Sequence, residues 1–349
     1  MKPVTIYDIA KEAGVSVATV SRVLNNSAPV KHETRDKIKD LIQKYQFQPN
    51  ALARSLLKKE TGTIGIIFPD ITNPFFPMLL AGLEEEARSK GYHFFLCDTV
   101  STMGQMEDQY ERESQYISIL MEKQVDGIIM VGGRINLARP SKELTTEVAE
   151  TAKRVPVLLI NGQLPGTDLN RIYADERLGA ELATQHLIDL GHRRIAFAGG
   201  YRFMSNSVQR IQGFRKTMER NGLAVRPEWT LVTGYSADSG KEAFETLHSM
   251  GELPTAVFCA NDQIAIGMLK AARKAGLKVP EDLSLVGFDD IPYASYSIPE
   301  LTTVSLRSYE VGRSALDLLH RMIGKEKVSK RTVVKPELIV RESTAPPRC

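Results

Sequence analysis

The sequence has few cysteines and no long hydrophobic run. Its three cysteines, Cys97, Cys259 and Cys349, are an odd number and lack Cys-x-x-Cys spacing, which argues against a disulfide framework or a structural zinc site. No apolar run approaches the length of a membrane span, and charged residues stand among the first twelve positions, where a signal peptide would need its apolar segment. We therefore expect a cytoplasmic protein without a membrane-spanning segment.

Catalytic and metal-binding patterns are also scarce. The six histidines show no metal-ligand spacing, and the sequence contains neither a Gly-x-Ser-x-Gly nucleophile elbow nor a phosphate-binding loop. Asp289 and Asp290 form the one acidic pair worth weighing as acid and base catalysts. These patterns predict no enzyme, no metal and no cofactor, which leaves binding as the expected function.

The composition is that of a globular protein with an uneven distribution of charge. Hydrophobic residues make up 42% and charged residues 25% of the 349 positions, and this length predicts two or three domains. Residues 1–60 contain 11 lysines and arginines against 6 aspartates and glutamates, whereas the remaining residues contain 34 against 36. The excess predicts an anionic partner for the N-terminal part, either nucleic acid or a membrane surface.

Short apolar runs alternate with amphipathic segments from about residue 63 onward. Buried strands are indicated at 64–68, 93–97, 127–131, 157–160, 195–198 and 256–260, and helices at 75–90, 105–124, 177–190, 206–221 and 262–275. This alternation predicts parallel sheets flanked by helices. Because a single sheet of this length would be unusual, we predict an α/β fold of two doubly wound lobes with a ligand cleft at the carboxyl ends of their strands.

The first 60 residues follow a different pattern, with helices indicated at 6–13, 17–24 and 32–45 and no strand. Thr5 is a predicted N-cap with Asp8 three residues later, Gly14 ends the first helix, and Ser16 can cap the second. Two short helices joined by a few residues have the spacing of a helix-turn-helix. We therefore predict a small all-helical unit ahead of the α/β core.

Several short motifs follow one another along the chain. They are Thr5–Ala10, Ala13–Ser16, Thr19–Asn25, Thr34–Arg35, Pro49–Ala51, Asp70 with Asn73–Phe76, Asn261–Asp262, Gly287–Asp290 and Leu301–Val304. In this order they resemble the LacI/GalR family of bacterial transcriptional regulators over nearly the whole chain. The N-terminal signature is the specific part, because any single motif of the core would be a weak match alone.

The resemblance implies a division into domains. It gives a helix-turn-helix domain at 1–46, a hinge helix and linker at 47–60, a periplasmic-binding-protein-like core at 61–342 and a tail at 343–349. Within the core we expect one lobe from 61–162 and 292–324, and the other from 163–291 and 325–342.

The resemblance also places the helix at 17–25 in the major groove of DNA. Arg22 is the candidate for reading a guanine, because its guanidinium matches the O6 and N7 acceptors, and Val17 and Ala18 can contact thymine methyl groups. Short polar side chains suit phosphate contacts, and we assign to them Ser16, Thr19, Ser21, Asn25 and Thr34, with Thr5 on the same surface. The alternative for these side chains is helix capping on a solvated face.

The segment 50–56 resembles the hinge helix of the family, which becomes ordered on operator DNA. Asn50 and Ala53 belong to it, and Leu56 matches the leucine that enters the minor groove at the central base step. A helix this short is marginal alone in water, so we expect its folding to be coupled to binding. The alternative is an ordinary linker helix.

The effector cleft of the family maps to polar and aromatic residues of both lobes. They are Asn73, Phe75, Phe76, Asn161, Asn206, Arg210, Tyr235, Asn261 and Asp289. Their polar groups suit the hydroxyls of a sugar and their rings suit its C–H face, so a sugar or sugar phosphate is expected. Met204 stands where purine-binding members carry arginine, which disfavours a purine. The alternatives are core packing for Phe75 and Phe76 and a turn cap for Asp289.

Residues and resemblance together predict a homodimeric DNA-binding regulator without a membrane partner, a repressor of carbohydrate-utilisation genes controlled by its effector. The operator is expected to be a pseudo-palindrome with a central CG step, because pyrimidine–purine steps unstack easily. One alternative is a global carbon regulator activated by a corepressor or partner protein. From another class, the alternative is a cytoplasmic sugar-binding enzyme with an accessory helical domain.

Overall fold

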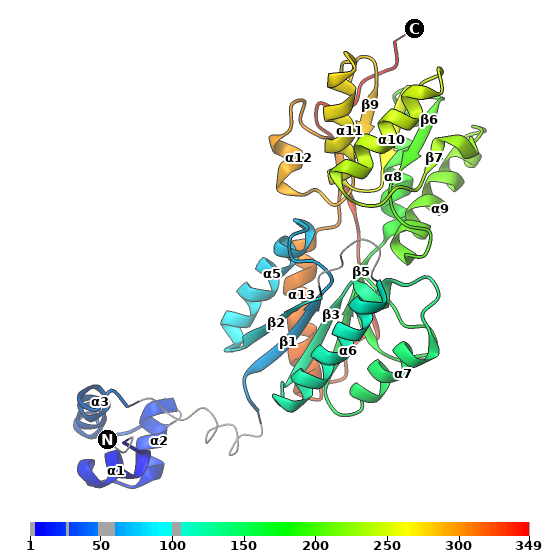
Figure 1. The fold of residues 1–349 in the computed structure, drawn as a ribbon. Coiled ribbons are helices and arrows are strands. Elements are labelled where there is room, and N and C mark those ends of the chain that lie inside the picture. Colours follow the sequence, from blue (N-terminus) through cyan, green and yellow to red (C-terminus); the bar gives the residue numbers. More distant parts are fainter. Residues whose placement is uncertain (1–3, 26–27, 48–59, 100–105, 349) are drawn as a thin grey trace. The chain divides into compact units, whose positions relative to one another are not determined.

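The computed structural model describes residues 4–25, 28–47, 60–99 and 106–348 (Figure 1). These residues belong to two compact units, a small N-terminal head and a large core, which are divided in the sequence between Thr61 and Gly62. The predicted hinge helix at 50–56 lies outside the described residues.

The head consists of the three predicted helices, α1 (Ile6–Ala13), α2 (Val17–Asn25) and α3 (His32–Lys44). Thr5 begins α1 with the predicted capping box, in which its backbone N–H donates to Asp8 Oδ2 and its hydroxyl oxygen accepts from the Asp8 N–H. Gly14 ends the helix with φ 72°, a left-handed conformation that glycine adopts readily.

The first lobe of the core is built on a six-stranded parallel sheet. Its strands, in spatial order, are β11 (Arg331–Val334), β5 (Asn170–Ala174), β4 (Val157–Ile160), β3 (Gly127–Val131), β1 (Thr63–Phe68) and β2 (His93–Asp98). Its helices are α5 (Phe75–Lys90), α6 (Met106–Glu122), α7 (Lys142–Thr151) and α13 (Ser308–Ile323), with a 3-10 helix, η1 (Gly133–Asn136), after β3.

Neighbouring residues of the central strands enter separate apolar clusters on the two faces of this sheet. Ile66 of β1 packs in the cluster that contains Leu79 of α5, and Ile67 packs in the cluster that contains Leu120 of α6. Because both faces are covered, β1, β3 and β4 read as nearly continuous apolar runs in the sequence.

The second lobe repeats this plan on a four-stranded parallel sheet. Its strands, in spatial order, are β7 (Thr230–Leu231), β6 (Ile195–Ala198), β8 (Ala256–Cys259) and β9 (Ser284–Val286). Its helices are α8 (Glu176–Asp189), α9 (Ser205–Arg220), α10 (Ala237–Ser249), α11 (Asp262–Lys274) and α12 (Pro292–Tyr296), with η2 (Pro227–Trp229). Figure 1 shows the two lobes of the core, and the predicted fold class of two doubly wound parallel sheets is confirmed.

The chain passes between the lobes three times, after β5, after β10 (Thr303–Ser305) and after β11. At the second and third crossings, β10 pairs antiparallel with β12 (Glu337–Ile339). This pair joins the lobes without belonging to either parallel sheet.

The structure corrects the predicted boundaries of the lobes. The ranges 163–291 and 325–342 place β5 and β11 in the second lobe, but both strands pair within the sheet of the first. The range 292–324 places α12 in the first lobe, whereas α12 packs against α11 of the second. Hydrophobic periodicity reports local structure and does not say which strand pairs with which, because pairing joins residues that are far apart in the sequence.

The predicted tail at 343–349 is partly built into the second lobe. The Leu285 N–H donates to the Ser343 carbonyl, and the Ser284 hydroxyl donates to the Ala345 carbonyl. These bonds extend the edge of the second lobe beyond β9, so residues 343–345 belong to the core.

Two features of composition can be followed in the structure. Cys97 and Cys259 are free and buried, and burial raises the pKa of the Cys97 thiol to about 11. No described helix combines the length and apolar character that a membrane span requires.

Candidate functional site

A cavity of about 1030 Å³ lies between the two lobes of the core. The loops after β1, β3 and β4 line it from the first lobe, and the loops after β6, β8 and β9 line it from the second. The carboxyl ends of parallel strands therefore face it from both sides. All nine predicted effector residues line this one cavity: Asn73, Phe75, Phe76, Asn161, Asn206, Arg210, Tyr235, Asn261 and Asp289.

Arg210 of α9 is 3% exposed and is held by a set of fixed neighbours. Its Nε donates to Glu176 Oε2 at 2.6 Å, its Nη2 donates to Asp289 Oδ1 at 3.0 Å, and its Nη1 donates to the Ala260 carbonyl. Its Cζ lies 3.9 Å from the centre of the Phe288 ring. Burial alone lowers the pKa of Arg210, but Asp289 and Glu176 outweigh it and hold that pKa above its ordinary value.

Asp289 has a strained backbone and a shifted pKa. Its φ of 99° lies in the region that favours glycine, and such strain is common at binding sites. Burial raises the pKa of its carboxyl group to about 6, against the opposing effect of Arg210. The adjacent Asp290 pairs instead with Arg341 Nη2 at 2.7 Å. The two carboxyl groups therefore serve different partners and do not form a catalytic couple.

The four predicted asparagines form hydrogen bonds within the cavity wall. Asn261 is engaged at both ends, because Oδ1 accepts from the Ile264 N–H and Nδ2 donates to the Tyr235 carbonyl. The side-chain oxygens of Asn73, Asn161 and Asn206 accept from the backbone N–H groups of Phe75, Ala174 and Ser207, respectively. These oxygens shape the loops, a role that was not predicted from the sequence.

Aromatic rings line both sides of the cavity. Phe75 and Phe76 meet edge to face with ring centroids 5.3 Å apart, and both belong to a buried apolar cluster of the core. They therefore pack in the core, as the alternative interpretation predicted, and also line the cavity. Tyr201 and Phe203 stack with centroids 5.0 Å apart, and Tyr235 meets Tyr201 edge to face. Burial raises the pKa of Tyr235 to about 12.

Several residues of the cavity were not predicted. They include Asp70, Thr72, Asp108, Gln109, Asn136, Glu176, Tyr201, Phe203, Ser236 and Gln263. Their position soon after a strand or at the start of a helix is the one signal that could have found many of them, because ligands bind at the carboxyl ends of parallel strands. Glu176 reads as an ordinary first-turn acid of α8, and only the structure places it beside Arg210.

Arg134 of η1 is fully buried and connects, through hydrogen bonds, helices of the first lobe. Its guanidinium donates to Glu113 Oε2 at 2.6 Å, to the Tyr110 carbonyl at 2.7 Å and to Glu147. Burial raises the pKa of Glu113 to about 7, against the opposing effect of Arg134. This network joins α6 and α7 to η1 and thereby positions Asn136, which ends η1 at the cavity.

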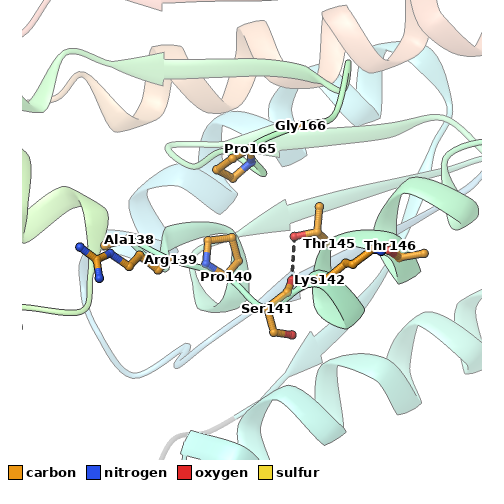
Figure 2. A pocket seen from close by; sticks show the side chains of 9 residues that line it. All are labelled: Ala138, Arg139, Pro140, Ser141, Lys142, Thr145, Thr146, Pro165 and Gly166. Carbon is orange, nitrogen blue, oxygen red and sulfur yellow. Dashed lines mark hydrogen bonds between the residues drawn. The ribbon is translucent and has the colours of Figure 1, made fainter.

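A second hollow, of about 590 Å³, lies on the first lobe at the start of α7 (Figure 2). Ser141 caps this helix by accepting from the Leu144 N–H, and Thr145 Oγ1 donates to the Ser141 carbonyl. Arg139 and Lys142 are among the residues that line it, and none of the predicted site residues does. We therefore take the cavity between the lobes as the candidate ligand site.

The head presents one face of α2 to solvent. Arg22 is exposed and makes no hydrogen bond or ion pair with another described residue, and Ala18 is exposed one turn before it. Val17 is half-buried against the apolar cluster of the head, and Val20 is fully buried in it. Arg22 and Ala18 are therefore available to a DNA groove, whereas Val17 is shared with the core of the head.

The polar residues predicted at the DNA surface have local roles as well. Thr5 Oγ1 donates to Asp8 Oδ2 at 2.6 Å, and Ser16 Oγ accepts from the Thr19 N–H at 3.2 Å, so the capping alternative holds for Thr5 and Ser16. Ser21 and Thr34 are half-buried on α2 and α3, and Asn25 ends α2. Asn50, Ala53 and Leu56 lie outside the described residues.

Comparison with known proteins finds matches in both units. Residues 5–50 match the family model described as bacterial regulatory proteins, lacI family, and residues 184–344 match the periplasmic binding protein-like domain. The chain is 36% identical over 347 residues to the HTH-type transcriptional regulator DegA of Bacillus subtilis (strain 168), which is 98% of either chain.

Two solved structures are similar over nearly the whole chain. One is the Lac repressor dimer bound to operator and the anti-inducer ONPF, with a TM-score of 0.86, 28% identity and coverage of 99% of this chain and 100% of that one. The other is a complex of the transcriptional regulator CelR with cellobiose, with a TM-score of 0.70, 29% identity and coverage of 97% and 99%. The similarity thus extends through both units.

Proposed function

The chain belongs to the LacI family of bacterial transcriptional regulators, and from this premise we propose that it is a repressor of carbohydrate-utilisation genes whose affinity for operator DNA is controlled by a sugar-type ligand in the cavity between its lobes. As a member of this family it is a DNA-binding regulator and not an enzyme. Because its target is chromosomal DNA, we place its action in the cytoplasm.

The observation that carries the ligand part of the proposal is the convergence of nine predicted residues on one cavity. A ligand that contacts both lobes stabilises one arrangement of the lobes over others, and it changes DNA affinity only as far as it binds those arrangements differently. The similarity to the transcriptional regulator CelR, whose solved structure is a complex with cellobiose, supports a carbohydrate as the ligand.

The proposed operator is a pseudo-palindrome with a central CG step. Arg22 would read a guanine in each half-site, and the exposed face of α2 supports this assignment. Leu56, in the segment proposed as a hinge, would enter the minor groove at the centre, where a pyrimidine–purine step costs the least energy to unstack.

Selection of binding sites from random duplexes by the full-length protein tests this function. We expect two inverted half-sites around CG, because two identical heads bind related half-sites. A duplex with the central CG exchanged for GC is the matched control. The protein should bind this duplex more weakly than the selected operator, by about 1–3 kcal/mol. Selected duplexes without dyad symmetry would contradict the proposal.

A homodimer forms part of the same proposal, and among the exposed large apolar side chains of the core two groups each contain residues that are close together in the sequence. Phe95 and Leu96 are 45% and 51% exposed on β2, an edge strand of the first-lobe sheet. Tyr296 and Ile298 are 75% and 84% exposed at and after the end of α12 in the second lobe. An apolar edge strand and an apolar surface patch are both typical of an interface, and we assign them to a second copy of the chain.

The double substitution Leu96→Asp with Ile298→Asp should convert the dimer to a monomer at micromolar concentration. Each aspartate would be buried without a partner in the interface, which is costly, but would remain hydrated in the monomer. Sedimentation velocity measures the outcome. Met250→Asp, at an apolar side chain that is 40% exposed after α10, is the control and should leave the dimer intact. A double variant that sediments as a dimer would contradict this interface.

A further inference from the structure

We infer that the cavity selects an uncharged polyhydroxylated ligand and rejects its phosphorylated counterpart, with Asn136 as a specificity-determining residue. This deepens the proposed function and rests on it, because it takes the cavity as the effector site. It decides between the two ligand classes, sugar and sugar phosphate, that the sequence left open.

The ionisable side chains of the cavity are mostly acidic. Among the described residues that line it, Asp70, Asp108, Glu176 and Asp289 carry carboxyl groups, and Arg210 alone is basic. A phosphate monoester brings a charge of about −1.5 to −2 at neutral pH, and like charges repel more strongly in a partly buried site than in water. The cavity therefore offers a phosphorylated ligand more repulsion than attraction.

Arg210 offsets only part of this repulsion, because three of its five N–H groups are already used. Each of its three nitrogens donates to a protein oxygen, from Glu176, Asp289 and the Ala260 carbonyl. The guanidinium is also covered by the Phe288 ring. A phosphate that binds the two remaining N–H groups would lie close to the carboxyl groups of Glu176 and Asp289, which repel it.

Three of the helix N-termini at the cavity carry side-chain caps, whereas α9, which begins beside Met204, has none. Such termini attract anions through their free N–H groups. Here the Ile264 N–H of α11 is bonded to Asn261, the Ser239 N–H of α10 to Ser236, and the Leu178 N–H of α8 to Asp175, as side-chain caps of those helices. The chain has thus provided its own acceptors at these three helices.

Asn136 holds, in the wall of the cavity, an acceptor to which no described residue donates, and we assign to it the recognition of an uncharged hydroxyl. It is 7% exposed and lines the cavity, and its Oδ1 is buried without a hydrogen-bond partner among the described residues. An unpaired buried amide oxygen costs free energy in the empty protein. A hydroxyl group can both donate to and accept from an amide, whereas an ionised phosphate can only accept. The stacked rings of Tyr201 and Phe203 add an apolar face for the C–H side of a sugar ring.

Calorimetric titration and thermal melting of the full-length dimer with matched ligands test the inference. The probes are glucose, trehalose, maltose and cellobiose, each paired with its own 6-phosphate as the anionic counterpart. We expect at least one neutral sugar to raise the melting temperature, and the phosphate of any sugar that binds to bind at least tenfold more weakly. A phosphate that binds as tightly as its neutral counterpart, or no shift with any neutral sugar, overturns the inference.

Two variants separate a ligand contact from a structural role. Asn136→Ala should leave the melting temperature of the ligand-free protein unchanged or raise it, because the substitution removes an unsatisfied polar group. The same substitution should weaken binding of the neutral ligand at least tenfold. The control Asn161→Ala should lower the ligand-free melting temperature, because the Asn161 Oδ1 accepts from the Ala174 N–H. If Asn136→Ala lowers that temperature and leaves ligand affinity intact, the assignment of Asn136 fails.

Operator binding by the same preparations separates failure of the ligand inference from failure of the proposed function. If the protein binds its selected operator but no neutral sugar, its role as a DNA-binding regulator is retained and the inference about the ligand fails. If neutral sugars bind and no operator is selected, the proposed function fails, and the preference for an uncharged ligand stands.

Discussion

Arg210→Ala is expected to destabilise the core by about 3–5 kcal/mol and to abolish the response to ligand. The guanidinium pairs with Glu176 at 2.6 Å and with Asp289 at 3.0 Å, and its removal leaves two buried carboxylates facing each other without a counter-charge. Urea unfolding measures the loss of stability, and the ligand-induced shift in melting temperature measures the response.

The matched control removes an arginine from an exposed ion pair. Arg88 pairs with Glu84 at 3.0 Å one turn earlier on α5, where both side chains are more than half exposed. Its replacement by alanine should cost about 0.3–0.5 kcal/mol. A similar small cost for Arg210→Ala would show that the buried triad contributes little.

A gentler variant separates stability from ligand response. Asp289→Asn keeps the size of the side chain, leaves the Arg210–Glu176 pair in place and relieves the repulsion between two carboxylates. We expect stability close to that of the parent with loss of the ligand response. An unchanged response in this variant would exclude Asp289 from ligand binding.

Arg22→Ala should weaken operator binding by about 1–3 kcal/mol, roughly 5- to 150-fold, and blunt discrimination at one base pair in each half-site. Arg22 is exposed on α2 and is not engaged by another described residue, so its guanidinium is available to a base edge. Electrophoretic or fluorescence titrations against the selected operator, its single-base variants and random duplex measure both effects at one fixed salt concentration.

Lys39→Ala is the control for charge alone, because Lys39 is an exposed base on α3 of the same head. This substitution should weaken binding to the operator and to random duplex by a similar factor, or should change neither affinity. If Arg22→Ala also weakens both duplexes equally, Arg22 contacts the phosphate backbone and does not read a base.

The helices of the head could be predicted from the sequence because their signals are local. Thr5 with Asp8, Gly14 and Ser16 act within three or four residues of their own positions, and the structure shows these bonds and turns where the pattern placed them. The alternation of strands and helices in the core is local in the same sense, and it predicted two parallel sheets correctly.

The sequence by itself determined the fold class, the family and a set of nine residues that share one cavity. Hydrophobic periodicity and the order of motifs can be recognised from residues that are close together in the sequence. Only the tertiary structure decided that β5 and β11 complete the first sheet, that Glu176 and Asp289 pair with Arg210, and that the Asn136 oxygen has no hydrogen-bond partner among the described residues. Strand pairing, ion pairing and burial depend on residues brought together from distant parts of the chain, and no local pattern records them. The same contacts decide the charge that the cavity presents to a ligand.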